Sequence, residues 1–289
     1  MYRVESRNIL TPQNGMNIYI GRTEDSMLLN EIRDGDPMDI GAKYDAPSLL
    51  AGTLKTRRNK GMILMGNLGD PYNEHEQELG LVRKSLKVIE YFDYGVIINT
   101  RRNGILRDMD ILENISRKTR CVVEIPLPSL NDEKLGLIDG KDTLTVSERL
   151  QLMKTLADAG VIVVASLYPI IPYVNDDPEE LMETVERLIP TGVAAIDICD
   201  GRVMVRKAIR DFFYQEFRER FPSEYKAFTD ELGEPQEFYI RDKAAVLKQL
   251  GEAIYGAGLM SDTKQIKLFK RKYENKQTGE QLSLFDTPF

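Results

Sequence analysis

Short apolar runs alternate along this chain with longer segments in which apolar residues recur every three or four positions. Six of the runs are rich in Val and Ile and nearly continuous, which is typical of parallel strands that are buried on both faces. They cover residues 16–20, 62–66, 96–99, 121–127, 161–167 and 193–199. The pattern therefore predicts six strands of one buried sheet.

Helical spacing fills the segments between these runs, because residues three and four positions apart lie on one face of a helix. The predicted apolar faces consist of Leu79, Val82, Leu86 and Ile89; Met109, Leu112 and Ile115; Leu150, Met153 and Ala157; and Leu181, Val185 and Leu188. The chain thus repeats a strand followed by a helix.

Residues with capping chemistry mark the ends of two predicted helices. Thr145 and Glu148 have the spacing of a capping box, and Gly160 provides a stop. Asp177, followed by a proline, is typical of an N-cap, and Gly192 ends that segment. These signals agree with the helices predicted from spacing.

Right-handed crossovers turn six strand–helix units into a parallel sheet, either an open partial barrel or a doubly wound sheet. In both folds, ligands bind beyond the carboxyl ends of the strands. The loops at that edge cover residues 21–36, 67–75, 100–104, 128–143, 168–176 and 200–206. We therefore expect a functional site among these loops.

The pattern changes after residue 221. An acidic and polar stretch precedes a predicted helix over residues 242–255, which ends near Gly256 or Gly258. Basic residues then gather between Lys264 and Lys276. We divide the chain into an α/β region (1–221), a C-terminal helical extension (222–260) and a basic tail (261–289).

Composition indicates an ordinary soluble globular protein, since 42% of the 289 residues are hydrophobic and 29% are charged. No apolar stretch is long enough for a membrane span, and the N-terminus lacks the apolar core of a signal peptide. We expect a cytoplasmic protein without a membrane partner. The net charge of −7 argues against nucleic-acid binding by the whole surface, but it permits a local basic patch.

The cysteine count limits the metal chemistry. The chain has two cysteines, Cys121 and Cys199, and one histidine, His75. This excludes a four-cysteine zinc site, a disulfide framework and an iron–sulfur cluster held by three cysteines of this chain. Cys199 and His75 are both expected near the carboxyl ends of strands, but no third ligand accompanies them. We expect no metal site.

Short segments along nearly the whole chain share one further pattern in their order and spacing. They are residues 9–19; Gly69 to Tyr72 with Glu76 and Arg83; residues 100–108; residues 169–172 with Asn175 and Asp176; Arg206 with residues 212–214; and residues 281–285. Together they resemble the spore-photoproduct-lyase-like branch of the radical S-adenosylmethionine (SAM) enzymes. The resemblance implies a partial (β/α)6 barrel with a C-terminal helical extension and tail, and a SAM region at Gly66, Asp70, Tyr72 and Thr100.

The chain departs from this family where the family's chemistry lies. The family places Cys-x3-Cys-x2-Cys after the first strand, and three thiolates hold a [4Fe–4S] cluster that chelates SAM. Here Arg22, Ser26 and Leu29 stand at those positions, and none of them supplies a thiolate. The resemblance therefore implies the fold without the cluster, no catalytic residue for a radical reaction, no bound cofactor and only weak residual SAM binding.

Two further features of the predicted mouth have alternative interpretations. The turn from Gly66 to Asp70 contacts SAM in the family, but it also fits a tight strand-to-helix turn. Arg101 and Arg102 replace the family's Lys-Ser, and together with Arg22 they would form a phosphate-binding pocket. Their alternative is solvated surface.

The tail pentapeptide resembles the bacterial sliding-clamp-binding motif, in which a glutamine precedes hydrophobic anchors. The expected partner-binding residues are Gln281, Leu282, Leu284 and Phe285. The alternative is a tail that packs on its own domain. Upstream, Phe269 and Tyr273 lie among the basic residues, which suits either contact with nucleic acid or a solvated amphipathic helix.

Three functions follow as hypotheses. The first is a catalytically inactive or diverged relative that binds DNA and the sliding clamp. The second is a redesigned or cysteine-replaced form of a radical SAM lyase. The third is an enzyme with cluster-independent chemistry at the mouth, using Asp70, Asp139 or Asp200 as a general base. We prefer the first, because the clamp motif is intact while the cluster cysteines are absent.

Overall fold

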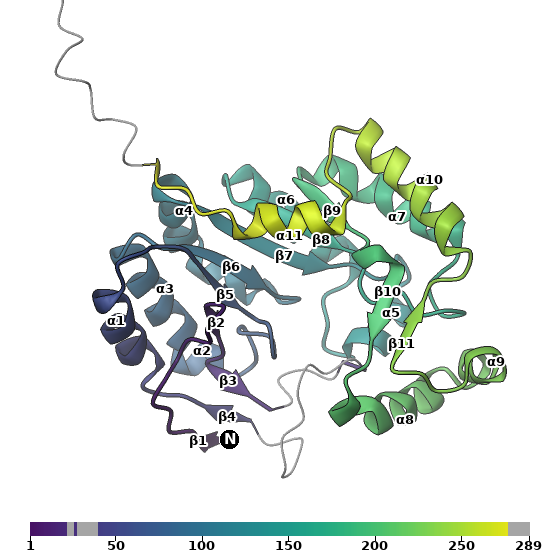
Figure 1. Cartoon of the computed structure of the whole chain (residues 1–289), viewed down its shortest axis with the longest axis horizontal. Helices are drawn as coiled ribbons and strands as arrows, with labels where there is room; N and C mark the ends of the chain where they lie inside the picture. The colour runs from purple at the N-terminus through teal and green to yellow at the C-terminus, as the bar shows by residue number, and fades with distance from the viewer. Residues whose placement is uncertain (22–25, 28–39, 277–289) are drawn as a thin grey trace, which may run out of the picture.

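The largest sheet of the protein has six parallel strands, as the sequence predicts (Figure 1). The computed structural model describes residues 1–21, 26–27 and 40–276. In spatial order the strands are β2 (Gly15–Met16), β5 (Met62–Met65), β6 (Gly95–Asn99), β7 (Cys121–Pro126), β8 (Ile162–Ser166) and β9 (Ala195–Asp197). Consecutive strands are neighbours, so the sheet is wound in one direction as a partial (β/α)6 barrel.

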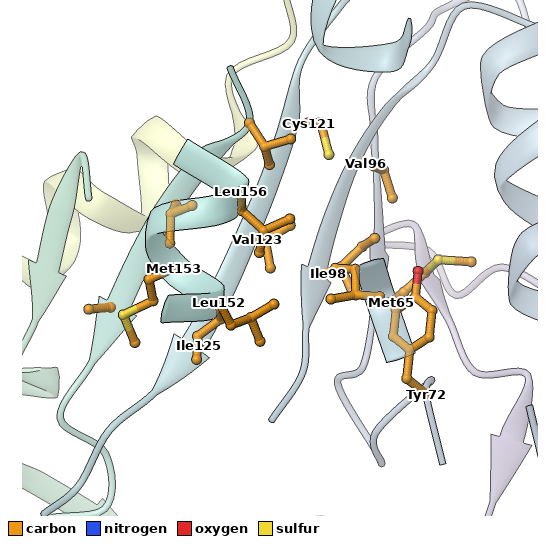
Figure 2. Packing of buried hydrophobic residues seen from close by; sticks show 14 of the residues in the cluster. Met65, Tyr72, Val96, Ile98, Cys121, Val123, Ile125, Leu152, Met153 and Leu156 are labelled. Carbon is orange, nitrogen blue, oxygen red and sulfur yellow. The ribbon is translucent and has the colours of Figure 1, made fainter. Parts of the chain in front are cut away.

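Helices cover the convex face of this sheet, where most of the alternate strand residues are Val and Ile, with Met65, Cys121 and Ala165 among them (Figure 2). Val123 of β7, for example, packs near Leu156, and Ile125 packs near Leu152; all four side chains are buried. The helices of this layer are α1 (Ala46–Thr56), α3 (Leu81–Tyr91), α4 (Met109–Lys118), α6 (Val146–Asp158), α7 (Pro178–Leu188) and α10 (Lys243–Gly256). Burial of these side chains is the main source of stability.

The concave face carries the other alternate residues and is covered by one C-terminal helix, α11 (Thr263–Arg271) (Figure 1). Ile266 of α11 packs in a cluster with Ile97, Val122 and Val164. Phe269 and Tyr273 also face the protein: Arg120 lies 4.5 Å from the Phe269 ring, and the Tyr273 hydroxyl donates to the Asp93 carbonyl. This favours the amphipathic helix over aromatic contact with nucleic acid.

The predicted caps are present. Thr145 and Glu148 form a reciprocal capping box at the start of α6, and the Asp177 side chain accepts from two backbone amides of α7. Gly160 and Gly192 both have positive φ, at 77° and 82°, after the segments that they end.

The first predicted strand divides into two. β2 belongs to the barrel, whereas β3 (Tyr19–Ile20) pairs antiparallel with β4 (Gly41–Ala42), which in turn pairs with β1 (Tyr2–Arg3). The side chain of Tyr19 turns to Glu76, to which its hydroxyl donates at 2.6 Å. The apolar run over residues 16–20 therefore serves two sheets, which its hydrophobicity does not reveal.

An aromatic lobe follows the barrel. The ribbon of β10 (Arg202–Met204) and β11 (Glu237–Tyr239) packs with α8 (Arg210–Arg220) and α9 (Pro222–Leu232). Phe213, Phe217 and Phe228 form its centre, with neighbouring ring centroids 5.3–5.8 Å apart. In the part of the chain that the structure describes, no helix combines the length and apolar character needed to cross a membrane.

Candidate functional site at the barrel mouth

A cavity of ≈ 190 Å³ opens at the carboxyl ends of β5 to β8. Gly66 and Asp70 follow β5, Thr100 follows β6, Glu124 lies on β7, and Tyr168 follows β8. Three of the predicted SAM-region residues, Gly66, Asp70 and Thr100, thus line one cavity. The cavity lies at the edge of the sheet where a site is expected.

Asp70 joins the first two loops of the mouth. Its carboxylate accepts hydrogen bonds from the Thr100 hydroxyl (2.8 and 3.0 Å), the Arg101 amide (2.7 Å) and the Tyr72 amide (2.9 Å). A carboxylate offers about four acceptor positions, so these three donors use most of its capacity. The arrangement favours a structural role for Asp70 over the role of general base.

Gly66 allows the turn after β5 to approach the end of β6. Its φ is +82°, and a Cβ at this position would lie 2.1 Å from the Asn99 carbonyl oxygen. Only glycine fits without a shift of the backbone. The tight-turn interpretation of this segment is therefore favoured, although its backbone still lines the cavity.

The structure separates the fourth predicted residue, Tyr72, from the cavity. It is 4% exposed, and its hydroxyl donates to Asp108 at 3.2 Å. Burial and the Asp108 carboxylate raise the pKa of Tyr72 above its usual value. Tyr72 lies instead beside a second cavity of ≈ 400 Å³.

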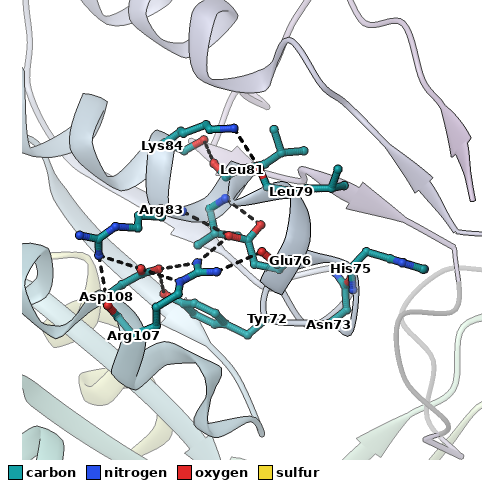
Figure 3. Close-up of polar contacts among 12 residues, drawn as sticks. Tyr72, Asn73, His75, Glu76, Leu79, Leu81, Arg83, Lys84, Arg107 and Asp108 are labelled. Atoms are coloured by element: carbon teal, nitrogen blue, oxygen red, sulfur yellow. Dashed lines mark hydrogen bonds and ion pairs between the residues drawn. The ribbon is translucent and has the colours of Figure 1, made fainter.

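A charged network supports the loop after β5 (Figure 3). Arg107 pairs with Glu76 at 2.7 Å, and Arg83 pairs with Asp108 at 3.0 Å. Glu76 also accepts from the backbone amide of Val82, which joins α2 (Glu76–Leu79) to α3. The sequence pattern singled out Glu76, Arg83 and residues 100–108, but it gave no signal that the buried Asp108 would pair with both Arg83 and Arg107.

A buried triad orients Arg101 at the mouth. Asp139, the last residue of α5 (Asp132–Asp139), lies 3.1 Å from Arg101 and 2.9 Å from Arg149. The side chains of Asp139 and Arg149 are fully buried. Asp139 is therefore held between two guanidinium groups, without the solvent access that a general base needs.

Arg101 and Arg102 do not converge as a phosphate pocket requires. Arg101 lines the mouth cavity, whereas Arg102 lines the second cavity with Arg107. The predicted third member, Arg22, lies outside the described residues. Asp200, the remaining candidate base, is exposed in the turn after β9, and its backbone amide donates to Thr263.

The far wall of the cavity contains Glu124, Ser166 and Tyr168. Burial raises the pKa of Tyr168 to about 12, against the opposing effect of Arg101 and Arg206, so its hydroxyl is a neutral donor at pH 7. Glu124 pairs with Lys270 of α11 at 2.5 Å. Burial disfavours the charged form of Lys270, but the Glu124 carboxylate outweighs this and raises the pKa of the ammonium.

The two thiols lie on different elements, Cys121 on β7 and Cys199 in the turn after β9. Cys121 is fully buried toward the helix layer, and burial raises its pKa to about 12 (Figure 2). Cys199 follows β9, where burial and Asp197 raise its pKa. The His75 ring points away from the Glu76 network (Figure 3). Within the described residues, no group of three or more His, Cys, Asp or Glu side chains could hold a metal ion.

A [4Fe–4S] cluster does not fit the donor set of this chain, because three thiolates are needed and two cysteines exist. Of the positions that resemble the cluster motif, Ser26 is described and is 1% exposed. The next residue, Met27, is fully buried, and its amide donates to the Ile138 carbonyl at 2.9 Å. Leu29 and the clamp-motif residues Gln281, Leu282, Leu284 and Phe285 lie outside the described residues.

Known protein families give no match to this chain, and curated proteins give none either. Among solved structures, a spore photoproduct lyase double mutant with bound AdoMet and dinucleoside spore photoproduct has TM-score 0.62 and 13% identity, over 89% of this chain and 77% of that one. The lyase complexed with dinucleoside spore photoproduct has TM-score 0.57 and 14% identity, over 86% and 75%. These matches confirm the predicted fold.

Proposed function

We propose that the chain is a cluster-free relative of the spore-photoproduct-lyase-like enzymes and that it acts by binding rather than by radical cleavage. One observation carries the proposal: the chain combines that fold with two thiols, and Cys121 faces the helices on the convex side of the sheet. A three-thiolate site cannot be assembled at the mouth from such a set.

The mouth cavity supports retained binding of a small ligand. Thr100, Ser166 and Tyr168 supply hydroxyl groups in its wall, and the turn from Gly66 to Asp70 supplies backbone. The cavity of ≈ 190 Å³ is small beside the ~300–1,000 Å³ of ordinary ligand pockets. We expect it to enclose part of SAM, with weak affinity, since no cluster chelates the amino-acid end.

The C-terminal region supports association with DNA and the sliding clamp. Lys264, Lys267 and Arg271 are exposed on the outer face of α11, so their charges are available to phosphates. The clamp-like motif begins ten residues after Arg271 in the chain. In this proposal the tail binds the clamp while the basic face of α11 contacts DNA.

The first test is anaerobic reconstitution with iron and sulfide, followed by measurement of iron and sulfide per chain. We expect no stoichiometric cluster in the unaltered protein. The matched variant is Arg22→Cys with Ser26→Cys and Leu29→Cys, which restores the family spacing and should hold about four irons. A stoichiometric cluster in the unaltered protein, or SAM cleavage by it, would refute the proposal.

The second test measures binding to a purified bacterial sliding clamp by titration calorimetry. Leu284→Ala with Phe285→Ala should weaken binding by at least about tenfold, because such anchors dominate small interfaces. Thr287→Ala is the matched control in the same tail and should leave binding unchanged. Absence of clamp binding by the unaltered chain would favour the redesigned scaffold instead.

A further inference from the structure

The C-terminal segment lies inside the barrel rather than beside it. Met260 bridges to Ala195 of β9, and Thr263 donates to Asp197 at 2.8 Å, near the carboxyl end of the sheet. The segment then crosses the concave face, where Ile266 is fully buried (Figure 1). It therefore spans from one end of the strands toward the other.

Contacts at the far end fix the segment there. Arg120, which precedes β7 and is 5% exposed, pairs with Glu274 at 3.1 Å and donates to the Phe269 carbonyl. Lys276 donates to the Ser116 carbonyl at 2.7 Å. Because both ends are anchored, the residues between them have a defined position on the concave face.

Lys270 lies between these anchors and meets the wall of the mouth cavity. Its ammonium is 2.5 Å from Glu124, and the two side chains are only 13% and 16% exposed. Besides Glu124, Asp197 of β9 and Cys199 of the following turn help to raise the pKa of Lys270. One carboxylate oxygen of Glu124 accepts from Lys270, while the residue itself lines the cavity.

We infer that Lys270 is a positioning residue of the mouth site, which acts by holding the Glu124 carboxylate in the cavity wall as an acceptor for a hydroxyl or amino group of the ligand. The inference rests on the proposed function, in which the mouth binds a ligand. It makes the C-terminal segment part of the site, although Glu124 and Lys270 are 146 residues apart. Because Lys270 already fixes the Glu124 carboxylate, that side chain loses little conformational freedom when a ligand binds. Such pre-organisation favours ligand binding.

The test is titration calorimetry with SAM as the probe, since SAM presents both hydroxyl and amino donors. Lys270→Met and Glu124→Gln should each weaken SAM binding by about tenfold. The double variant should be no weaker than either single one, because Lys270 acts through Glu124. Lys270→Arg keeps the charge and should bind like the unaltered protein.

The matched control is Lys154→Met, which removes a lysine from an exposed pair with Asp158 and should leave SAM binding unchanged. Losses that add in the double variant, or unchanged affinity in Lys270→Met, would overturn the inference. A lower stability of Lys270→Met without a change in affinity would also overturn it, because that is the signature of a merely structural lysine.

A separate measurement distinguishes failure of this inference from failure of the proposed function. If the unaltered protein does not bind SAM, the proposed ligand is wrong. Amide hydrogen exchange over α11 then decides whether Lys270 and Glu124 act as a pair. Equal acceleration in Lys270→Met and Glu124→Gln supports the pair, and unchanged exchange in either variant rejects it.

Discussion

The two faces of the sheet come from the same strands but differ in what their side chains do. On the convex face, mainly Val and Ile of the strands pack against apolar side chains of the helices, with burial close to complete. The concave face changes along each strand: Ile97 and Val122 lie toward the amino end, and Asn99 and Glu124, which are register partners, lie toward the mouth. Hydrophobicity alone therefore specifies the side chains of the convex face, whereas the concave face combines apolar packing with a polar site.

The largest expected effect lies in the polar region at the mouth. Asp139→Ala leaves the fully buried Arg149 without its carboxylate, which should lower the free energy of unfolding by about 3–5 kcal/mol. Urea denaturation measures the change. Asp139→Leu with Arg149→Met should recover most of the loss, since it removes the two fully buried charges and leaves only the partly exposed Arg101. An equally large loss of unfolding free energy in this double variant would show that the shape of the two side chains, rather than their charge, stabilises this region.

The matching change on the convex face is Leu156→Ala. Leu156 is fully buried in α6, so the lost contacts and the remaining cavity should cost about 2–5 kcal/mol in the same assay. SAM binding at the mouth should remain, because Leu156 is outside the cavity lining. Loss of binding with retained folding would show that the two faces are coupled more tightly than their separate chemistry indicates.

A smaller change in the free energy of unfolding is expected at Asn99, where substitution should affect ligand binding more than stability. Its side-chain oxygen is buried and has no hydrogen-bond partner among the described residues, while the residue lines the mouth. Asn99→Leu should therefore change the free energy of unfolding by no more than about 1 kcal/mol, or raise it. Any SAM affinity should fall. A large destabilisation would contradict the view that this residue serves the site rather than the fold.

The convex face was easier to predict from the sequence than the concave face. Continuous Val and Ile runs specify strands buried on both sides, and the Thr145 capping box and Asp177 cap specify helix starts, because each signal is local. Pairing across the chain is not local. The spacing around Ile266 predicts an amphipathic helix, but it cannot identify the sheet as the surface that the helix covers.

The polar site was only partly predictable for a related reason. The resemblance named Gly66, Asp70 and Thr100, and parallel strands, which bring their carboxyl ends together, predicted only that the loops after these strands meet. Arg101 and Arg102 are adjacent in sequence but line different cavities, since successive side chains leave an extended backbone in opposite directions. The ion pair of Glu124 and Lys270 carries no sequence signal, because any exposed helix could supply such a lysine.

The smallest expected effect concerns alkaline pH. The pKa of Lys270 is raised in the folded protein, so its contribution to stability is complete below the unfolded value of about 10.4 and is lost as the pH rises through the folded value. The difference in unfolding free energy between the unaltered protein and Lys270→Met should therefore shrink above about pH 10.4. Tyrosines with raised pKa values titrate in both proteins and cancel in the difference. Lys270→Arg, which stays charged, should keep its advantage at pH 11, and a constant difference across this range for the unaltered protein would mean that the ammonium of Lys270 does not stabilise the concave face.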